Sequence, residues 1–415
     1  MEIWNNAGGT LKMGRFPYDA EDRGLRAWNG ADTLIIEHLK IFADGNAGAG
    51  NNCAGVKRLN VLILNDSFGA LSVAALNLGH SVRLQSDSAV TRIAFAKNCE
   101  MNKIEGIEKT DDSEPPKFTL IDSLSPLDFS TWQPDIVLMQ IPKSTLLLEF
   151  QLTFLTTVLP AGIPICAGAM TRDVHNSTIN LFETIIGPTK TSLAAHKARL
   201  IHSTFTGEAA KPSVLKKTET SWPRIQKLSE EGLPELDLFN HAGVFSASGH
   251  DKGSLTLLHY IAEIKNDLEQ CIIDCGCGNG LLALVAAKLF PHSKLICADE
   301  SFMAVESARA GFTHNNIAER ADFVWTDCLN GVENEKADLI LCNPPFHSGM
   351  GQTQTISIAQ RMFEDSRRCL KPSGKLLVVT NGHLGHNRYL ESLFTQVSIV
   401  RENERFVVIE AKNLD

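Results

Sequence analysis

Short apolar segments alternate with longer helical segments twice along the chain, at closely similar intervals. The first series of apolar segments lies at 59–64, 81–85, 118–121 and 136–140. The second series lies at 271–274, 294–299, 323–326 and 339–342. Strands that alternate with helices favour a parallel sheet with helices on both faces. Because the pattern recurs, the sequence predicts two tandem copies of one α/β domain.

The two copies differ in the loop after their first strand. At 274–280 the second copy reads Asp-Cys-Gly-Cys-Gly-Asn-Gly. The stretch that we align with it, at 65–71, reads Asn-Asp-Ser-Phe-Gly-Ala-Leu and keeps one glycine. Glycines let the backbone approach a ligand closely, so we expect the second copy to be active and the first to be degenerate. We place the two domains at 1–220 and 221–415, joined by a linker near 206–235.

Composition is that of a globular protein. Apolar residues make up 43% of the chain and charged residues 21%, which is usual for a soluble domain. No run approaches the roughly 18 apolar residues that a membrane helix needs, and the first residues lack the pattern of a secretion signal. We therefore expect a cytoplasmic protein with no membrane partner. The ten cysteines include no pair of Cys-x-x-Cys units, so we expect no metal.

Glycines and acidic residues of the second copy indicate a site for a nucleoside-containing cofactor. The spacing Gly-x-Gly-x-Gly differs from the Gly-x-Gly-x-x-Gly of pyrophosphate-binding dehydrogenases. Asp274, just before this loop, would meet a cationic group of the cofactor. Asp299 and Asp327 end the next two strands, at the edge of the sheet where ligands bind, and could accept hydrogen bonds from a ribose diol and an adenine amino group. The loop glycines are Gly276, Gly278 and Gly280.

The sequence Asn-Pro-Pro-Phe follows the fourth strand of the second copy, where the first copy has Gln-Ile-Pro-Lys at 140–143. Proline fixes φ near about −65° and offers no N–H, so the backbone carbonyls here would point into the site. The Asn343 side-chain oxygen and the Pro344 carbonyl could then accept both hydrogens of a planar –NH2 group. Such bonds draw the nitrogen lone pair out of ring conjugation, as attack on an electrophilic methyl group requires. Phe346 would stack on the base.

On these motifs, the region 240–412 resembles the class I S-adenosylmethionine-dependent methyltransferases of the Asn-Pro-Pro-Phe/Tyr type. With its degenerate first copy, the whole chain resembles the ribosomal RNA guanine-N2 methyltransferases, and among them the ribosomal RNA large subunit methyltransferase G family. The resemblance rests on Val-Leu-Ile-Leu-Asn-Asp-Ser-Phe-Gly-Ala-Leu-Ser at 61–72, Leu-Ala-Ala-His-Lys-Ala-Arg-Leu at 193–200, and 332–347. It implies two Rossmann-like methyltransferase domains.

The resemblance also implies an activity, which is methylation of one guanine N2 in 23S rRNA with S-adenosylmethionine as the cofactor. The reaction would be a direct displacement at the methyl group, with Asn343, Pro344 and Phe346 as the catalytic residues. The segment from His241 to Gly253 is similar to the part of the family that covers the cofactor. Its expected cofactor contacts are Phe245, Asp251 and Gly253.

The net charge of −9 argues against a nucleic-acid partner, yet basic residues gather at 186–224. This stretch holds seven lysines and arginines against two acidic residues. Salt screens charges beyond about 8–10 Å, so such a patch can bind phosphates within an acidic chain. A solvated linker face fits the same residues equally well. We expect Lys143, Lys190, Lys197 and Arg199 to contact RNA, on a monomeric chain.

Three alternatives stay open. Within methyl transfer, the substrate could be 16S rRNA or a protein glutamine, although the duplicated architecture disfavours the glutamine enzymes. A nucleotide-binding oxidoreductase would bind NAD in place of S-adenosylmethionine. An RNA-binding or assembly module with an idle site is disfavoured because Asp274, Asp299, Asp327 and Asn343 are intact.

Overall fold

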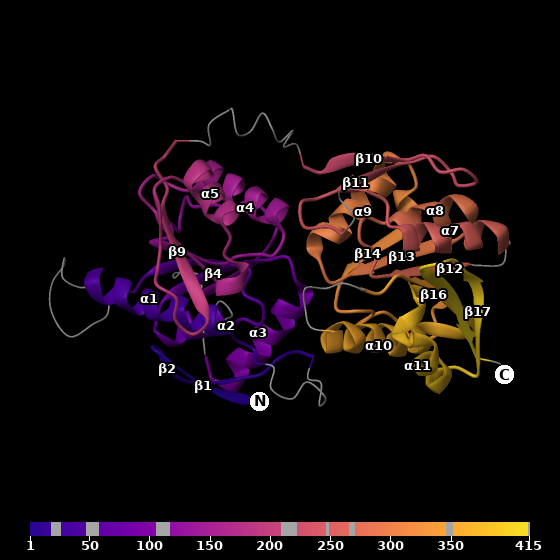
Figure 1. Cartoon of the computed structure of the whole chain (residues 1–415), viewed down its shortest axis with the longest axis horizontal. Coiled ribbons are helices and arrows are strands. Elements are labelled where there is room, and N and C mark those ends of the chain that lie inside the picture. Colours follow the sequence, from indigo (N-terminus) through magenta and orange to yellow (C-terminus); the bar gives the residue numbers. More distant parts are fainter. Residues whose placement is uncertain are drawn as a thin grey trace. The chain divides into compact units, whose positions relative to one another are not determined.

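The computed structural model describes two compact units, Met1–Thr220 and Ser221–Asp415 (Figure 1). Among the described residues, no helix combines the length and the apolar character that spanning a bilayer requires. The side chains of residues 46, 352–355 and 383 are not described. The described residues are 1–17, 26–46, 58–104, 117–208, 222–245, 249–264, 270–345 and 352–413.

The N-terminal unit is built on a seven-stranded sheet with the order β5-β4-β3-β6-β7-β9-β8. Its strands are β3 (Asn60–Leu64), β4 (Ser81–Ser86), β5 (Phe118–Asp122), β6 (Ile136–Gln140), β7 (Pro164–Met170), β8 (Thr189–Thr191) and β9 (Ala198–Thr204). One face packs against α1 (Gly30–Asn46), α2 (Ala70–Asn77), α3 (Ala89–Met101) and a hairpin of β1 (Glu2–Asn6) and β2 (Gly9–Met13). The other face packs against α4 (Thr145–Val158) and α5 (Asn176–Ile185).

The C-terminal unit repeats this plan, with the order β14-β13-β12-β15-β16-β18-β17. Its strands are β12 (Cys271–Cys275), β13 (Lys294–Asp299), β14 (Ala321–Trp325), β15 (Ala337–Cys342), β16 (Leu370–Asn381), β17 (Gln396–Glu402) and β18 (Phe406–Lys412). One face packs against α7 (Lys252–Ile264), α8 (Leu281–Leu289), α9 (Phe302–His314) and a hairpin of β10 (Arg224–Leu228) and β11 (Leu236–Asn240). The other face packs against α10 (Gln352–Cys369) and α11 (His386–Leu393), so that helices cover both sides of the sheet (Figure 1).

The two sheets have the same strand order, which confirms the prediction of a duplicated α/β fold. Two features differ from the sequence expectation. In each sheet one strand, β9 or β18, runs antiparallel to both of its neighbours, so that the edge strand beyond it, β8 or β17, runs in the direction of the parallel strands. Part of the segment 206–235, expected to be a linker, is strand β10, which pairs with β11 to form a hairpin. The N-terminal unit has a corresponding hairpin, β1–β2.

The glycine that begins the second helix of each unit is required by helix packing. Gly69 and Gly280 both have left-handed backbone, with φ of 76° and 79°. A Cβ on Gly280 would lie 2.9 Å from the Ala308 Cβ of α9, and a Cβ on Gly69 would lie 2.7 Å from the Phe95 Cβ of α3. A side chain at either place would therefore push two helices apart. This glycine survives in the degenerate copy because the fold needs it.

The loops between strand and helix align differently from the sequence expectation. In both units four residues separate the last strand residue from the helix-starting glycine. Asn65 and Gly276 are each the first of the four, and both have positive φ, 61° and 80°. Asn65 is thus the counterpart of Gly276 and not of Asp274, and the alignment made from the sequence was wrong by two residues.

Candidate active site

A cavity of about 580 Å³ lies at the carboxyl ends of β12, β13, β15 and β16. This is the edge of an open parallel sheet at which ligands bind. Gly253, Asp274 and Gly280, also expected at the site, are not part of the cavity wall. Phe346 lies outside the described residues. The predicted residues that line the cavity are Phe245, Asp251, Gly276, Gly278, Asp299, Asp327, Asn343 and Pro344.

The glycine loop presents bare backbone to this cavity. Gly278 has a φ of 53°, and a Cβ placed on it would meet no atom within 4 Å. Asp299 fixes the loop because its Oδ2 accepts a hydrogen bond from the Gly278 N–H at 2.8 Å, while its Oδ1 accepts one from the Ser301 N–H at 2.9 Å. Asp299 is half-buried and lines the cavity, so its carboxylate links the glycine loop to the cavity wall.

Asp274 lies beneath the loop, where it is fully buried. Its Oδ2 accepts a hydrogen bond from the Ala283 N–H in the first turn of α8 at 3.0 Å, and its Oδ1 has no partner among the described residues. Burial, and secondarily the charge of Asp299, raise the pKa of Asp274 to about 7 despite that backbone bond. The structure thus places Asp274 under the cofactor loop and not in the cavity.

Asp327 stands at the far side of the cavity and is 8% exposed. Its carboxylate forms an ion pair with Arg361 of α10 through Oδ2. The thiol of Cys328, which also lines the cavity, lies 3.6 Å from Oδ1. One side of this carboxylate is therefore neutralised by Arg361, while the second oxygen is in weak contact with the Cys328 thiol.

The Asn343 amide is held in one orientation by residues at the start of α7. Its Nδ2 donates to Asp251 Oδ2 at 2.9 Å and to Ser254 Oγ at 2.8 Å. The same Asp251 oxygen accepts from the Ser254 N–H at 2.7 Å, which ties these groups into one network. Asn343 Oδ1 is buried and has no partner among the described residues. An unpaired buried acceptor costs free energy unless a donor reaches it, so this oxygen is suited to a ligand N–H.

The cavity wall also contains residues that the sequence did not predict, among them Ser254, Asn381, Arg405 and Phe406. Ser254 belongs to α7 and Asn381 to the end of β16, while Arg405 and Phe406 belong to the β17–β18 connection and β18. Phe406 explains why residue 253 is a glycine, because a Cβ at that position would lie 3.2 Å from the Phe406 ring. Gly253 thus lets α7 pack closely against β18. No motif spacing links these residues to the glycine loop, so only the folded sheet could identify them.

The N-terminal counterpart of this site is closed by its own side chains. Asn65 Nδ2 donates to the Gln140 carbonyl and to Gln151 Oε1, both at 2.9 Å, and Asn65 Oδ1 accepts from Gln151 Nε2 at 2.8 Å. Ser67 Oγ donates to Gln140 Oε1 at 3.2 Å, and Gln140 Nε2 donates to Asp32 of α1. The polar groups that replace the glycines and the Asn-Pro-Pro-Phe motif therefore satisfy one another.

Three of the four residues predicted to contact RNA lie at one edge of the N-terminal sheet, the edge formed by the carboxyl ends of its parallel strands. Lys143 follows the carboxyl end of β6. Arg199 lies where β9 pairs with the carboxyl end of β7, and the Lys197 carbonyl accepts a hydrogen bond at 2.9 Å from the first residue after β7. Lys190 lies away from this edge, because its β8 position pairs with the part of β9 beside the middle of β7. The two lysines at the edge are exposed and Arg199 is half-buried.

One group of potential metal ligands occurs among the described residues, in the N-terminal unit. His38, Cys166 and His202 place their ligating atoms within 4.8 Å of one another. Burial, with His202 as a smaller cause, lowers the pKa of His38 to about 4, and burial raises the pKa of the Cys166 thiol. Burial in an apolar core favours the uncharged forms of all three groups, which are two neutral imidazoles and a protonated thiol.

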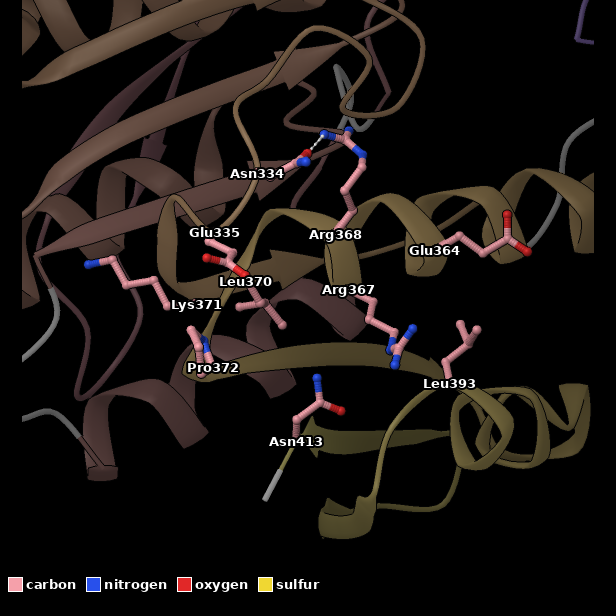
Figure 2. A pocket seen from close by; sticks show the side chains of 10 residues that line it. All are labelled: Asn334, Glu335, Glu364, Arg367, Arg368, Leu370, Lys371, Pro372, Leu393 and Asn413. Atoms are coloured by element: carbon pink, nitrogen blue, oxygen red, sulfur yellow. Dashed lines mark hydrogen bonds between the residues drawn. The ribbon is translucent and has the colours of Figure 1, made fainter. Parts of the chain in front are cut away.

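A second cavity of about 460 Å³ lies at the amino-terminal ends of β15 and β16 (Figure 2). Two of its cations are already paired. Arg368 donates to Asn334 at 2.8 Å and to Asp365, and Lys371 donates to Asp338 at 2.9 Å. The wall also carries Glu335 and Glu364. With Arg367 also in the wall, the surface carries charges of both signs and so favours no ligand of one charge.

Comparison with known proteins covers the whole chain. The RLMG N-terminal domain matches residues 1–207, and the Methyltransferase small domain matches residues 235–410. The ribosomal RNA large subunit methyltransferase G of Pseudoalteromonas translucida is 38% identical over 406 residues, which are 97% of this chain and 96% of that protein. The protein of the same name from Klebsiella pneumoniae is 39% identical over 408 residues, with the same coverage.

A solved structure shares the fold across both units. The T. thermophilus 16S rRNA N2 methyltransferase, in complex with AdoMet and guanosine, aligns with a TM-score of 0.74 at 18% identity. The alignment covers 100% of this chain and 98% of that one. The shared fold is a pair of Rossmann-like methyltransferase units, as the sequence predicted. Since relatives at 38–39% identity cover nearly their full length, this chain belongs to the ribosomal RNA large subunit methyltransferase G family.

Proposed function

We propose that the C-terminal unit transfers the methyl group of S-adenosylmethionine to the exocyclic N2 of a guanine in 23S rRNA. The observation that carries this proposal is the Asn343 amide, whose Nδ2 is held by Asp251 and Ser254 while its buried Oδ1 has no partner among the described residues. Such an acceptor, beside a proline carbonyl and opposite a glycine loop, suits an –NH2 group next to a cofactor. The names of the family's relatives support ribosomal RNA of the large subunit as the substrate.

The cavity suits S-adenosylmethionine, which when bound supplies an electrophilic methyl group. Bare backbone at Gly278 leaves room for the cofactor. The Asp299 carboxylate lines the cavity and is suited to hydrogen bonds from ribose hydroxyl groups. Asp327, which follows β14, can accept the adenine amino group beside its ion pair with Arg361. Asp251 offers a half-buried carboxylate for a cationic group. Asp274 supports the loop from below and holds the start of α8.

In the reaction, Asn343 Oδ1 and the Pro344 carbonyl accept the two hydrogens of the guanine amino group. These bonds would localise the nitrogen lone pair for attack on the electrophilic methyl group that S-adenosylmethionine would supply. Asp251 and Ser254 keep the asparagine amide from rotating, and so hold its oxygen at the place where positive charge develops. The nitrogen becomes acidic only as the new bond forms, so solvent can take its proton and no general base is required. Phe346 remains the predicted stacking partner of the base.

The target base must leave its stack to reach this cavity, at a cost of a few kcal/mol. We assign RNA binding to the N-terminal unit, whose former ligand loop is occupied by its own hydrogen bonds. Lys143, Lys197 and Arg199 lie at one edge of its sheet and can contact phosphates there. Because the net charge of the chain is −9, the chain as a whole does not attract RNA, and contacts to phosphates must come from a localised group of basic residues such as this one.

The activity can be tested by labelling. We expect the purified chain to transfer tritium from labelled S-adenosylmethionine to 23S rRNA isolated from a strain that lacks the enzyme, and to release labelled N2-methylguanosine after nuclease digestion. Isolated 16S rRNA and release factors serve as the competing substrates, and intact large subunits as an alternative form of the RNA. Label in 16S rRNA alone would overturn the large-subunit assignment. Binding of NAD without binding of S-adenosylmethionine would overturn the reaction class.

RNA binding by the N-terminal unit predicts a salt-dependent effect of charge reversal. The double substitution Lys197→Glu and Arg199→Glu should weaken binding to 23S rRNA, and should reduce the slope of log K against log salt by about one for each phosphate that the chain no longer neutralises. The matched control is Lys190→Glu, which reverses a charge in the same unit away from the sheet edge. Filter binding over a range of salt concentrations measures both. Equal weakening in the variant and in the control would show a general charge effect and contradict the assigned edge.

A further inference from the structure

We infer that Asn381 is a specificity-determining residue that reads the Watson–Crick edge of the target guanine. This inference rests on the proposed function and extends it to a residue outside the glycine loop and the Asn-Pro-Pro-Phe motif. Asn381 ends β16, the strand that pairs with β15, and lines the same cavity as Asn343. It is 3% exposed.

The two asparagine side chains stand on the same face of the sheet. Side chains alternate between faces along a strand. In β15, Leu339 and Leu341 pack in the core beneath α7, α8 and α9, so Asn343, the next residue of that series, faces the same way. In β16, Leu377 and Val379 belong to that core, which places Asn381 on this face as well. Both amides therefore reach the cavity from the side of α7.

Their positions along the sheet suit two neighbouring groups of one base. Cys342 of β15 pairs with Val378 of β16 in a parallel register. Continued by one residue, this register sets Asn343 level with Val379, so Asn381 lies two residues further along. At about 3.3 Å per residue, the two side chains are offset by roughly 7 Å along the strands. A purine held by its amino group at Asn343 can thus extend its edge toward Asn381.

Asn381 has an unused acceptor, as Asn343 does. Its Oδ1 is buried and without a hydrogen-bond partner among the described residues. A buried amide oxygen that is left unpaired costs free energy, which a bond from a ligand N–H would recover. The counterpart in the N-terminal unit is Met170, which pairs with Ala198 as Asn381 pairs with Phe406. The copy that lacks the Asn-Pro-Pro-Phe motif therefore has a thioether where the active copy has an amide.

With Oδ1 as the unpaired acceptor, the Asn381 amide matches the Watson–Crick edge of guanine. The Watson–Crick edge of guanine presents the N1–H as a donor beside the N2 amino group, and O6 as an acceptor. Asn381 Oδ1 can accept from N1–H while its Nδ2 donates to O6. A base with a bare N1 and an amino group at position 6 reverses both partners, so that neither bond forms in this orientation of the amide. Sites built on such bonds reject the wrong partner by large factors, up to about 10⁴–10⁵.

The test compares guanine with 2,6-diaminopurine, which keeps the N2 amino group and reverses the other two positions. Both bases are placed by RNA ligation at the 23S rRNA position that the labelling experiment identifies. We expect the wild-type chain to favour guanine by at least about 10²-fold in kcat/KM. Asn381→Ala should lose about 10²-fold on guanine and little on diaminopurine, so that the ratio approaches one. Calorimetry with S-adenosylhomocysteine should show unchanged affinity.

Asn387→Ala, the same substitution six residues later in α11, is the matched control and should leave the ratio unchanged. Equal reductions by Asn381→Ala on both bases, with the preference intact, would show a structural role and overturn the inference. Thermal melting of each variant identifies a folding defect, in which case the ratio is measured below the melting temperature. A wild-type chain that methylates neither base would overturn the proposed function itself, which is a different result.

Discussion

Replacing Asn343 with alanine is expected to lower kcat for methyl transfer by about 10²–10³-fold and to leave the affinity for the cofactor within about twofold. The substitution removes the acceptor that localises the lone pair of the amino group, an interaction that strengthens as the new bond forms. The loop at Gly278, Asp299 and Asp327 is untouched, so cofactor binding should persist. The Asp251 carboxylate still accepts from the Ser254 N–H, which keeps the start of α7 in place.

Single-turnover kinetics on 23S rRNA and calorimetry with S-adenosylhomocysteine separate these two effects. The matched control is Gln140→Ala, because Gln140, the last residue of β6, occupies the position in the N-terminal sheet that Asn343 occupies directly after β15. This control removes an amide from the degenerate unit and should alter neither rate nor cofactor affinity. Unchanged turnover in Asn343→Ala would refute the role of the amide. A loss of cofactor affinity would indicate that Asn343 binds the cofactor and not the amino group of the substrate.

Alanine at Gly278 and alanine at Gly280 are expected to fail in different ways, although the two glycines are two residues apart. At Gly280 a Cβ would lie 3.1 Å from the Ala308 Cα, and φ is 79°. Left-handed backbone costs about 1–2 kcal/mol for an alanine, and overpacking against a helix backbone adds about 1–3 kcal/mol. The free energy of unfolding should therefore fall by about 2–5 kcal/mol.

At Gly278 the Cβ meets no protein atom within 4 Å, so only the backbone cost applies to folding. The new methyl group instead projects into the volume assigned to the cofactor. We expect a loss of about 1–2 kcal/mol in stability and a weakening of cofactor binding by at least about tenfold. Denaturant unfolding and calorimetry measure the two quantities. Cofactor affinity equal to wild type in Gly278→Ala would mean that the cofactor does not pass over this loop.

Gly69→Ala is the control for packing, since its Cβ would lie 2.8 Å from the Phe95 Cα of α3. It should destabilise the N-terminal unit much as Gly280→Ala destabilises the other, and leave cofactor affinity unchanged. If both glycine variants that clash with a helix also showed weaker cofactor binding, the effect would be general unfolding and not loop geometry.

The duplicated fold could be predicted because the strands of a parallel sheet are buried on both faces and therefore consist of continuous apolar residues. The hairpins could not be predicted because their strands lack such apolar runs. In β10 the side chains are mostly polar and only Leu228 is buried, so Arg224–Leu228 resembled a basic linker. The antiparallel direction of β18 was also hidden, because an apolar run does not state its direction. Pairing with β16 decides that direction.

The candidate site was predictable where one short motif carried the chemistry. Asn343, Gly276 and Gly278 belong to such motifs, and the structure brings them to one cavity. Asp274 was expected in the cavity because it adjoins the loop, but the strand turns it inward, where it holds α8. Asn381 carries no local signal, since its relation to Asn343 depends on the pairing of two strands. The role of an isolated residue of this kind emerges only from the register of the sheet.

The self-bonded loop of the N-terminal unit has a consequence for how the chain persists in a cell. Asn65, Gln140 and Gln151 satisfy one another without any ligand, whereas the proposed catalytic unit leaves acceptors that only its ligands would satisfy. Ligand at 100 times its Kd adds about 2.7 kcal/mol to the state that binds it. On the proposed assignment, the supply of methyl donor sets the lifetime of one half of the protein against proteolysis. The resistance of the N-terminal unit to proteolysis should not depend on the concentration of the methyl donor.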